Sequence, residues 1–486
     1  MIEFRDVTFF YGEETAPSVD GVSLKIDKGE TVVLCGESGC GKSTMTRLIN
    51  GLIPHFHEGK LGGEVLYDGK RTMDMRLYEL SEHVGSVFQD PRTQFYNVES
   101  TVELAFGCEN LGVPPEEIEQ RITRTATRFG LEELLDRNLF AMSGGEKQRI
   151  ACGSVDATNP ETLVLDEPSS NLDLFAIHDL AQVVQRWRDD GKTLVIAEHR
   201  IFYLVDLADR FIYIRDGRIE REFRPDELRT LSPEALEDLG LRAPDPWKLA
   251  PRAEARGSGE SLSLRSLKCI TRGRRRLSIP ELTLPRGEII AVIGRNGAGK
   301  TTLARTLCGL EKTGSGVLGI DGATHDIRKR RDLVYMVMQD VNHQLFTEDV
   351  ISELLLSMDG TDPDAEQKRA MEILRSLDLD DKSGRHPMSL SGGEQQRVAI
   401  GSAIAAGREI LILDEPTSGL DHKRMTQVAD YLTAMSADGK TVLVITHDIE
   451  LVLRCCSHAI YLVDGEIAHK SRMDETGAQQ LREFFE

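Results

Sequence analysis

One set of short motifs occurs twice in this chain of 486 residues, in the same order each time. Each set begins with a glycine-rich loop that ends in a lysine, and continues with Ser-Gly-Gly-Glu, Leu-Asp-Glu-Pro and a histidine. The two lysines, Lys42 and Lys300, are 258 positions apart, whereas the serines, aspartates and histidines of the two sets are each 248 positions apart. A repeat of this kind predicts two copies of one nucleotide-binding module.

The glycine-rich loops follow the pattern Gly-x-x-x-x-Gly-Lys-[Ser/Thr], which is that of a phosphate-binding loop, or P-loop. Glycines let the backbone curl so that several N–H groups point at phosphate oxygens, and the next helix presents its positive N-terminal end to the same anion. Both loops follow an apolar strand and precede a helix, as the pattern requires. The residues expected to bind a nucleotide are Gly36, Glu37, Ser38, Gly39, Cys40, Gly41, Lys42, Ser43 and Thr44 in copy one, and Gly294, Arg295, Asn296, Gly297, Ala298, Gly299, Lys300, Thr301 and Thr302 in copy two.

The last residues of each loop have distinct expected roles. Lys42 and Lys300 would reach the β and γ phosphates, and the hydroxyls of Ser43 and Thr301 would contact Mg²⁺. The expected cofactors are therefore ATP and Mg²⁺.

Two acidic pairs come at the ends of apolar strands. Asp166 and Asp414 are expected to hold Mg²⁺ beside the phosphates, and Glu167 and Glu415 to orient or polarise the attacking water. Adjacent side chains at a strand end point in different directions, which suits one carboxylate on the metal and one on the water.

Two further polar side chains follow strands in each copy. His199 and His447 come after the next buried strand, and their equal spacing predicts that they sense the γ-phosphate. Gln89 and Gln339 also follow a strand, and we expect them in the shell of the metal and the attacking water.

The hydrophobic pattern predicts strands that alternate with helices, and hence a largely parallel α/β core. In copy one it predicts strands over 2–9, 22–26, 31–35, 86–89, 162–166 and 193–197, and helices over 42–52, 115–136 and 174–189. The segment 241–261 is rich in Pro, Ala and Gly and is interpreted as a linker, so that the first domain covers 1–240 and the second 262–486.

Composition restricts the partners. Acidic residues outnumber basic ones by 80 to 59, which gives a net charge of −21 and argues against a broad basic face for nucleic acid. No run approaches the ~18 apolar residues that a membrane span needs, and the N-terminus shows no secretion signal. Any membrane role is thus expected to come through a partner.

The motifs in this order resemble those of the ATP-binding cassette (ABC) ATPases, including Ser170-Asn-Leu-Asp173 and Ser418-Gly-Leu-Asp421 after the two Asp-Glu-Pro motifs. The resemblance implies ATP hydrolysis and two tandem P-loop domains, each with a mainly parallel core sheet, an antiparallel N-terminal β part and a helical subdomain. In that family two cassettes pack head to tail, here expected within one chain. Each ATP then also contacts the Ser-Gly-Gly segment of the other cassette: Ser143, Gly144, Gly145 and Glu146, or Ser391, Gly392, Gly393 and Glu394.

The chain departs from the family pattern at two points. The glutamine that usually follows Ser-Gly-Gly is Glu146 in copy one and Glu394 in copy two. Tyr11 is the expected aromatic stacking partner of adenine in copy one, whereas the aligned stretch 269–272 has no aromatic residue. The two sites are therefore expected to bind ATP unequally.

The segments after Gln89 and Gln339 favour one kind of cassette protein. Phe88–Tyr96 with Thr101–Gly107, and the matching 338–346 with 349–354, resemble the ATPases of energy-coupling factor (ECF) transporters, which import vitamins and transition-metal ions, although copy two lacks the proline. The resemblance implies a peripheral place on the cytoplasmic face of the cell membrane. It also implies two partners, an ECF-type transmembrane component and a separate substrate-binding membrane protein.

Other assignments remain open. Conventional ABC importers, for example of sugars, also use duplicated cassettes but usually have a degraded motif in one copy, and neither copy is degraded here. Tandem cassette proteins that act on ribosomes carry a long charged helical linker, and DNA-repair ATPases of this type carry large insertions or zinc cysteines. Residues 90–107 would, in the simplest alternative, be an amphipathic helix and turn that only pack on the cassette.

The acidic pairs give a first test. Glu167→Gln or Glu415→Gln is expected to leave ATP binding intact while it lowers turnover by orders of magnitude, because only the group that activates water is lost. Nucleotide binding and steady-state hydrolysis measured on the same preparation check this. Near wild-type hydrolysis by the double variant would refute the assignment.

Overall fold

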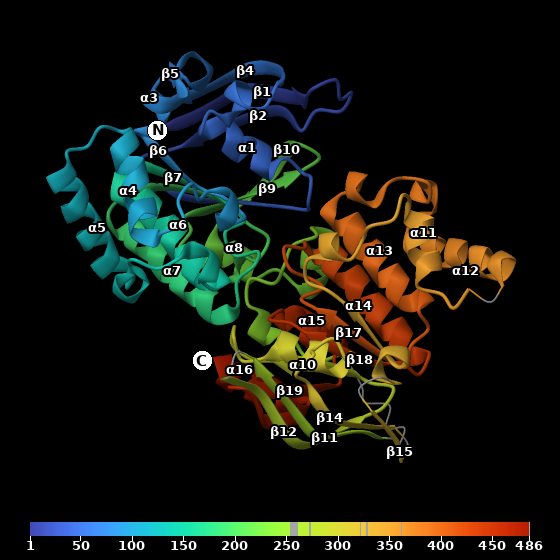
Figure 1. Cartoon of the computed structure of the whole chain (residues 1–486). Helices are drawn as coiled ribbons and strands as arrows, with labels where there is room; N and C mark the ends of the chain where they lie inside the picture. Colours follow the sequence, from blue (N-terminus) through green and yellow to red (C-terminus); the bar gives the residue numbers. More distant parts are fainter. Residues whose placement is uncertain (253–260, 272–273, 321, 327–328, 361, 486) are drawn as a thin grey trace. The chain divides into compact units, whose positions relative to one another are not determined.

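The structure is a computed structural model, and it describes residues 1–252, 261–271, 274–320, 322–326, 329–360 and 362–485. The chain forms two compact units, one made by Met1–Pro246 with Gly419–Lys423 and the other by Trp247–Ser418 with Arg424–Glu486 (Figure 1). Each unit has a six-stranded sheet that is mainly parallel, a four-stranded antiparallel sheet and a group of helices. The predicted α/β fold with two tandem P-loop domains is thus confirmed.

The six-stranded sheet of the first unit has the order β10-β9-β3-β8-β7-β6, and all neighbours pair in parallel except β10 with β9. Side chains of β3 alternate between two hydrophobic clusters, with Val32 and Leu34 in one and Val33 and Cys35 in the other. A strand covered on both faces must be apolar throughout, which explains the continuous apolar runs. The strands are β3 (Thr31–Cys35), β6 (Val84–Val87), β7 (Thr162–Asp166), β8 (Thr193–Ala197), β9 (Arg210–Arg215) and β10 (Arg218–Phe223).

The antiparallel sheet of this unit has the order β2-β1-β4-β5 and packs over one face of the parallel sheet, together with α1 (Lys42–Ile49). The helices α4, α5 and α6 lie together on another side, where α6 contacts both α4 and α5 (Figure 1). The remaining elements are β1 (Ile2–Tyr11), β2 (Val19–Ile26), β4 (Gly59–Tyr67), β5 (Lys70–Arg71), α2 (Leu52–His55), α3 (Leu77–Ser81), α4 (Ser100–Asn110), α5 (Pro115–Phe129), α6 (Gly144–Thr158), α7 (Leu174–Asp189), α8 (Pro225–Arg229) and α9 (Pro233–Asp238).

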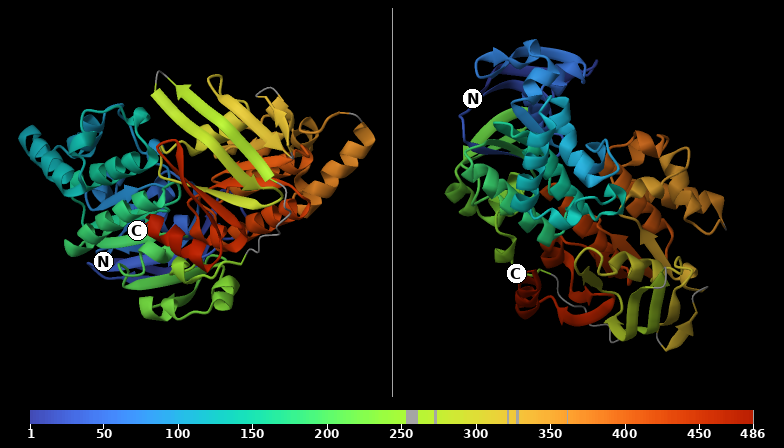
Figure 2. Two further views of the ribbon diagram at one scale, coloured as in Figure 1. Left: turned by 90° about the horizontal axis from the view of Figure 1, so that it is seen from below. Right: turned by 60° about the vertical axis from the view of Figure 1, so that its left-hand side comes forward.

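The second unit repeats this topology. Its six-stranded sheet has the order β16-β17-β18-β13-β19-β20 and its antiparallel sheet the order β12-β11-β14-β15. Strands β11 and β12 lie at a different side of the unit from helices α11 and α12 (Figure 2). The strands are β11 (Ser261–Thr271), β12 (Arg274–Pro285), β13 (Ile289–Ile293), β14 (Ser315–Ile320), β15 (Ala323–His325), β16 (Val334–Val337), β17 (Ile410–Asp414), β18 (Thr441–Ile445), β19 (His458–Val463) and β20 (Glu466–Arg472). The helices are α10 (Lys300–Leu307), α11 (Val350–Leu356), α12 (Pro363–Ser376), α13 (Gly392–Ala405), α14 (His422–Ala437), α15 (Ile449–Cys455) and α16 (Glu475–Phe485).

Element boundaries differ from the expected ones where the backbone changes course. Helix α1 ends at Ile49 because Gly51 has a positive φ of 76°, and α5 ends at Phe129 because Gly130 takes a left-handed conformation with φ 63°. Strand β6 ends at Val87, since the N–H of Phe88 turns to donate to Oε1 of Gln94, 3.2 Å away. The linker interpretation falls in part on residues 253–260, which lie outside the described residues.

Two further features concern the cysteines and the hydropathy of the helices. All eight cysteines are buried and free of disulfides. No helix in the described ranges combines the length and the hydropathy that crossing a bilayer requires.

The burial of side chains on the central strands provides a test of the core. Leu165 on β7 is completely buried, so Leu165→Ala should lower the free energy of unfolding by about 2–5 kcal/mol through lost burial and a cavity. Val102→Ala is the control, because Val102 is 43% exposed. Urea unfolding followed by circular dichroism measures both, and equal midpoints for the two variants would contradict the assigned core.

Candidate functional site

The P-loop of the first unit joins β3 to α1 through a backbone that only glycine can follow. A Cβ at Gly36 would lie 2.2 Å from the carbonyl oxygen of Ile214, and one at Gly41 would lie 2.4 Å from that of Ser18. Gly41 also has a φ of 107° at the N-cap position of α1. Side chains are therefore excluded where the loop must turn tightly, as predicted from the glycine spacing.

The start of α1 is suited to an anion. Its N-cap residue is a glycine, so no side chain caps the first N–H groups of the helix, and the same holds for α10 in the second unit. Uncapped N–H groups and the helix dipole together favour a phosphate at this point. The Nζ atom of Lys42 donates to the carbonyl oxygens of Gly36 (3.0 Å) and Glu37 (2.9 Å), which keeps its charge on the loop.

The second P-loop is built in the same way. The Nζ atom of Lys300 donates to the carbonyl oxygen of Gly294 at 2.6 Å and to that of Arg295 at 3.2 Å. It also lies 2.9 Å from Nε2 of His447. An ammonium group can only donate, so this imidazole nitrogen accepts.

A hydroxyl and a carboxylate meet beside each P-loop. The Oγ atom of Ser43 donates to Oδ1 of Asp166 (2.8 Å), and Oγ1 of Thr301 donates to Oδ2 of Asp414 (2.9 Å). Burial raises the pKa of both aspartates, and the hydroxyl hydrogen bonds act in the opposite direction. Oxygen donors of this kind are the ligands that Mg²⁺ prefers, so the two pairs fit the expected metal.

Glu167 contacts two other predicted site residues. Its Oε1 lies 3.2 Å from Nε2 of His199, and its Oε2 accepts from Nε2 of Gln89 at 2.8 Å. Burial would raise the pKa of Glu167, but the hydrogen bond from His199 and nearby positive charge outweigh it and lower the pKa. The carboxylate is thus favoured in its ionised form, as a water-orienting group requires.

Glu415 also lies beside its histidine, but the other contacts of its side chain differ from those of Glu167. Its Oε1 lies 3.3 Å from Nε2 of His447, and its N–H donates to the carbonyl oxygen of Ile445 at 2.8 Å. Gln339, in contrast, is exposed and its side chain makes no hydrogen bond within the described residues. The structure therefore brings Gln89 to its glutamate but leaves Gln339 apart.

The Ser-Gly-Gly-Glu motifs begin helices α6 and α13. In each, the backbone N–H of the serine donates to the glutamate, from Ser143 to Glu146 at 2.7 Å and from Ser391 to Glu394 at 2.8 Å. Burial acts to raise the pKa of Glu394, but hydrogen bonds from Lys382 and Ser391 bring it to about 2. The glutamate that replaces the usual glutamine therefore completes a capping box at the start of each helix. Its negative charge also interacts favourably with the positive end of the helix dipole.

Tyr11 stands beside the first P-loop. Its hydroxyl lies 3.3 Å from Oγ1 of Thr44 and accepts from Arg47 at 2.9 Å. Its ring meets His57 edge to face, with the centroids 6.0 Å apart. These contacts place an aromatic ring beside the first P-loop, while Cys269 of the second unit is buried and offers no ring.

Glu198 is a site residue that the sequence reasoning missed. It is 2% exposed, and its two oxygens accept from the N–H groups of Ser169 (3.2 Å), His199 (2.7 Å) and Arg200 (3.3 Å) and from the hydroxyl of Tyr203 (2.9 Å). Burial raises its pKa, which the hydrogen bonds from Ser169 and Tyr203 partly offset. Glu198 is thus a positioning residue that connects His199 to the turn after Glu167.

The second unit supports the corresponding segment differently. Thr446 occupies the position before His447, and Asp448 accepts from Oγ1 of Thr417 at 2.8 Å and caps α15. The signal for Glu198 in the sequence was its charge at the end of an otherwise apolar strand, where copy two has threonine.

A groove lies beside the segment that carries Gln89. It encloses about 310 Å³ between the end of α1, β6, α4 and α6, and Phe88 and Gln94 belong to its lining. Tyr96 is 79% exposed at this groove and stacks on Phe106, with centroids 4.9 Å apart. The loop is held from inside, because Glu103 accepts from the N–H groups of Tyr96 (3.1 Å) and Asn97 (2.8 Å).

The second unit holds the equivalent loop with the same contacts. The N–H of Met338 donates to Oε1 of Gln344 at 3.0 Å, as that of Phe88 does to Gln94. Buried Glu353 accepts from the N–H groups of Phe346 and Thr347, and the ring of Phe346 remains 74% exposed. Both units therefore present an aromatic side chain to the outside from a loop that their own hydrogen bonds fix.

Comparison with known proteins identifies relatives along the whole chain. A family model described as "ABC transporter" matches residues 19–170 and 277–418. A protein of Treponema denticola named "Putative ABC transporter ATP-binding protein" is 42% identical over 475 residues, which cover 96% of each chain. A second protein of that name and organism is 37% identical over 495 residues, covering 100% of this chain and 99% of the relative.

A solved structure shares the fold. "Model of ribosome-bound archaeal Pelota and ABCE1" includes a chain with a TM-score of 0.71 and 23% identity, covering 99% of this chain and 80% of that one. At this identity the likeness concerns the fold alone.

The contacts of Glu198 predict a measurable loss in the first site. A glutamine has one carbonyl oxygen, so Glu198→Gln would set an amide group against backbone N–H donors and displace His199. In a Glu415→Gln background, kcat should fall between about tenfold and a hundredfold with KM for ATP unchanged. Tyr203→Phe is the control, because it removes one donor of four and should cost less. Unchanged kcat in a folded Glu198→Gln protein would argue against the positioning role.

Proposed function

This chain belongs to the ABC transporter family as an ATPase with two cassettes, and we propose that it powers membrane import of a vitamin or transition-metal ion as the fused ATPase pair of an ECF-type transporter. In this proposal the chain lies on the cytoplasmic face of the cell membrane and acts on two partners, a transmembrane component and a separate substrate-binding membrane protein. The cassettes are placed at 1–240 and 262–486, with a linker over 241–261. The first compact unit extends slightly further, to Pro246.

In each site, different residues would perform different parts of ATP hydrolysis. Lys42 and the N–H groups at the start of α1 would bind the phosphates, and Ser43 and Asp166 would hold Mg²⁺. Bound there, the metal ion would neutralise charge on the transferred phosphoryl group. Glu167 would orient the attacking water, with His199 and Gln89 fixing its carboxylate.

One observation carries the link to a membrane partner: the groove is lined by the same segment that places Gln89 on Glu167. Phe88 precedes Gln89 and Gln94 follows it, and both line the groove. A helix inserted there would contact the segment directly and move Gln89 relative to the carboxylate of Glu167. Docking would thereby be coupled to hydrolysis, as a transport motor requires.

The exposed aromatic residues support a protein partner at these loops. Tyr96 and Phe346 are each more than two-thirds exposed, although their loops are held by buried glutamates. Large aromatic side chains on a rigid surface are typical anchors of protein interfaces. The segment's resemblance to ECF transporter ATPases favours a membrane subunit as this partner.

A pull-down tests the proposal as a whole. The tagged chain is recovered from gently solubilised membranes of the native host, and the proteins that follow are identified by mass spectrometry. A multi-helix membrane protein together with a small membrane binding protein is the expected result. Recovery of ribosomes without a membrane protein would overturn the transport role and leave the ATPase assignment.

The aromatic anchors give a sharper test. Tyr96→Lys with Phe346→Lys should reduce recovery of the membrane partner by about tenfold or more, because an interface anchor is worth ~2 kcal/mol or more. Basal ATPase activity should stay within about twofold of wild type, since neither ring contacts the carboxylates. Leu310→Lys with Val317→Lys, at exposed apolar positions elsewhere, is the matched control. Equal recovery by both double variants would exclude these rings as the docking point.

A further inference from the structure

A second groove lies on the helical part of the first unit, between α4 and α5. It encloses about 550 Å³, and five of its lining residues are apolar: Val113, Pro115, Ile118, Ile122 and Leu135. Ile118 packs into a small cluster with Cys108 and Ala157, and the partly buried side chains of Val113 and Ile122 pack against that cluster. The floor of this α4–α5 groove is thus apolar and open to a partner.

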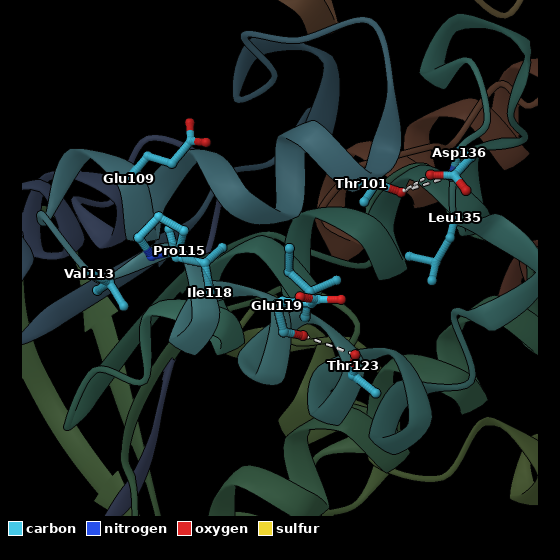
Figure 3. Close-up of a pocket in the computed structure, with 10 residues that line it drawn as sticks. Thr101, Glu109, Val113, Pro115, Ile118, Glu119, Thr123, Leu135 and Asp136 are labelled. Carbon is cyan, nitrogen blue, oxygen red and sulfur yellow. Dashed lines mark hydrogen bonds between the residues drawn. The ribbon is translucent and has the colours of Figure 1, made fainter.

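The rim of the α4–α5 groove is acidic. Glu109, Glu119 and Asp136 all line it and all are exposed (Figure 3). Asp136 accepts from Oγ1 of Thr101 at 2.7 Å, whereas Glu109 and Glu119 form no ion pair with any described residue. Carboxylates without a cation around an apolar floor leave negative potential that a positively charged ligand would complement.

This groove is separate from the one beside Gln89, although both use α4. Successive residues of a helix are rotated by about 100°. Thr101 and Glu109 therefore lie on one face of α4, while Glu103, Phe106 and Gly107, which line the other groove, lie on the opposite face. A partner in the α4–α5 groove would leave the other groove accessible.

The shape of the lining favours a peptide segment. Thr101 and Asp136 stand at one end, Val113 and Pro115 at the other, and Ile118 and Glu119 between them (Figure 3). Ile118 and Ile122 are four residues apart on α5, so they form a stripe along the helix that a second helix can follow. Phosphate-bearing ligands and anionic lipid surfaces are disfavoured, because the rim carboxylates repel them.

We propose that the α4–α5 groove is a docking site for a partner protein, which inserts a helical segment with apolar side chains on one face and Lys or Arg beside them. The apolar face covers Val113, Ile118 and Ile122, and the cations pair with Glu109 and Glu119. The site goes beyond the transport role, because it requires neither the groove beside Gln89 nor a membrane partner.

Fluorescence anisotropy with a synthetic probe tests this on the full chain. The probe is a labelled peptide of about four helical turns with leucines on one face and lysines flanking them. A scrambled peptide of equal composition is the control. The amphipathic peptide should bind about tenfold tighter than the scrambled one, since only it can place leucines on the floor. Glu109→Gln with Glu119→Gln should remove most of this difference. These side chains have no ion pairs to lose, so the fold is not at risk.

A matched variant distinguishes binding at the α4–α5 groove from attraction to the net negative charge of the protein. Glu348→Gln with Glu372→Gln removes two exposed carboxylates of the second unit, and it should bind the amphipathic peptide within about twofold of wild type. Equal affinity for both peptides, or an equal loss in the two double variants, would overturn the proposal in favour of bulk attraction to an acidic protein. Absence of binding would overturn it as well, and self-association that is lost with Glu109→Gln and Glu119→Gln would assign the groove to a second copy of the chain.

Discussion

The parallel pairing of β3, β8 and β7 is the constraint on which both sites depend. In the first unit Leu34 pairs with Ala197, and Ala197 pairs with Asp166. This register brings the ends of three strands to one edge of the sheet, although the ends of β3 and β8, Cys35 and Ala197, are more than 160 positions apart in sequence. The P-loop, the acidic pair and the histidine all follow these ends, so the register alone assembles most of the candidate site.

The backbone is strained where the acidic pair leaves the strand. Glu167 and Glu415 have positive φ values of 45° and 49°, which non-glycine residues rarely adopt. In both units the N–H of this glutamate donates across to the end of the neighbouring strand at 2.8 Å. The backbone turn separates the second carboxylate from the first, so that the aspartate meets the P-loop hydroxyl and the glutamate meets the histidine.

The two units share this frame and differ in the groups that support it. Glu198 connects His199 to the turn after Glu167, whereas the second unit uses Asp448 and Thr417. Gln89 reaches its glutamate, Gln339 does not, and Tyr11 has no aromatic counterpart at Cys269. These differences change how the reacting groups are positioned and not which groups are present. They are therefore expected to make the two sites unequal.

The sequence by itself determined the two P-loop modules and predicted the main residues of each candidate site, because glycine spacing, strand-end carboxylates and their repetition are local features. It also predicted a largely parallel core from strands that alternate with helices. Only the tertiary structure decided which side chains meet. Glu198 is recognised through four donors, of which three follow it directly in the chain and the fourth, Ser169, comes from the turn after Glu167. The α4–α5 groove arises from the packing of two helices with a later turn. Contacts of this kind depend on how distant segments pack, which no local pattern of residues specifies.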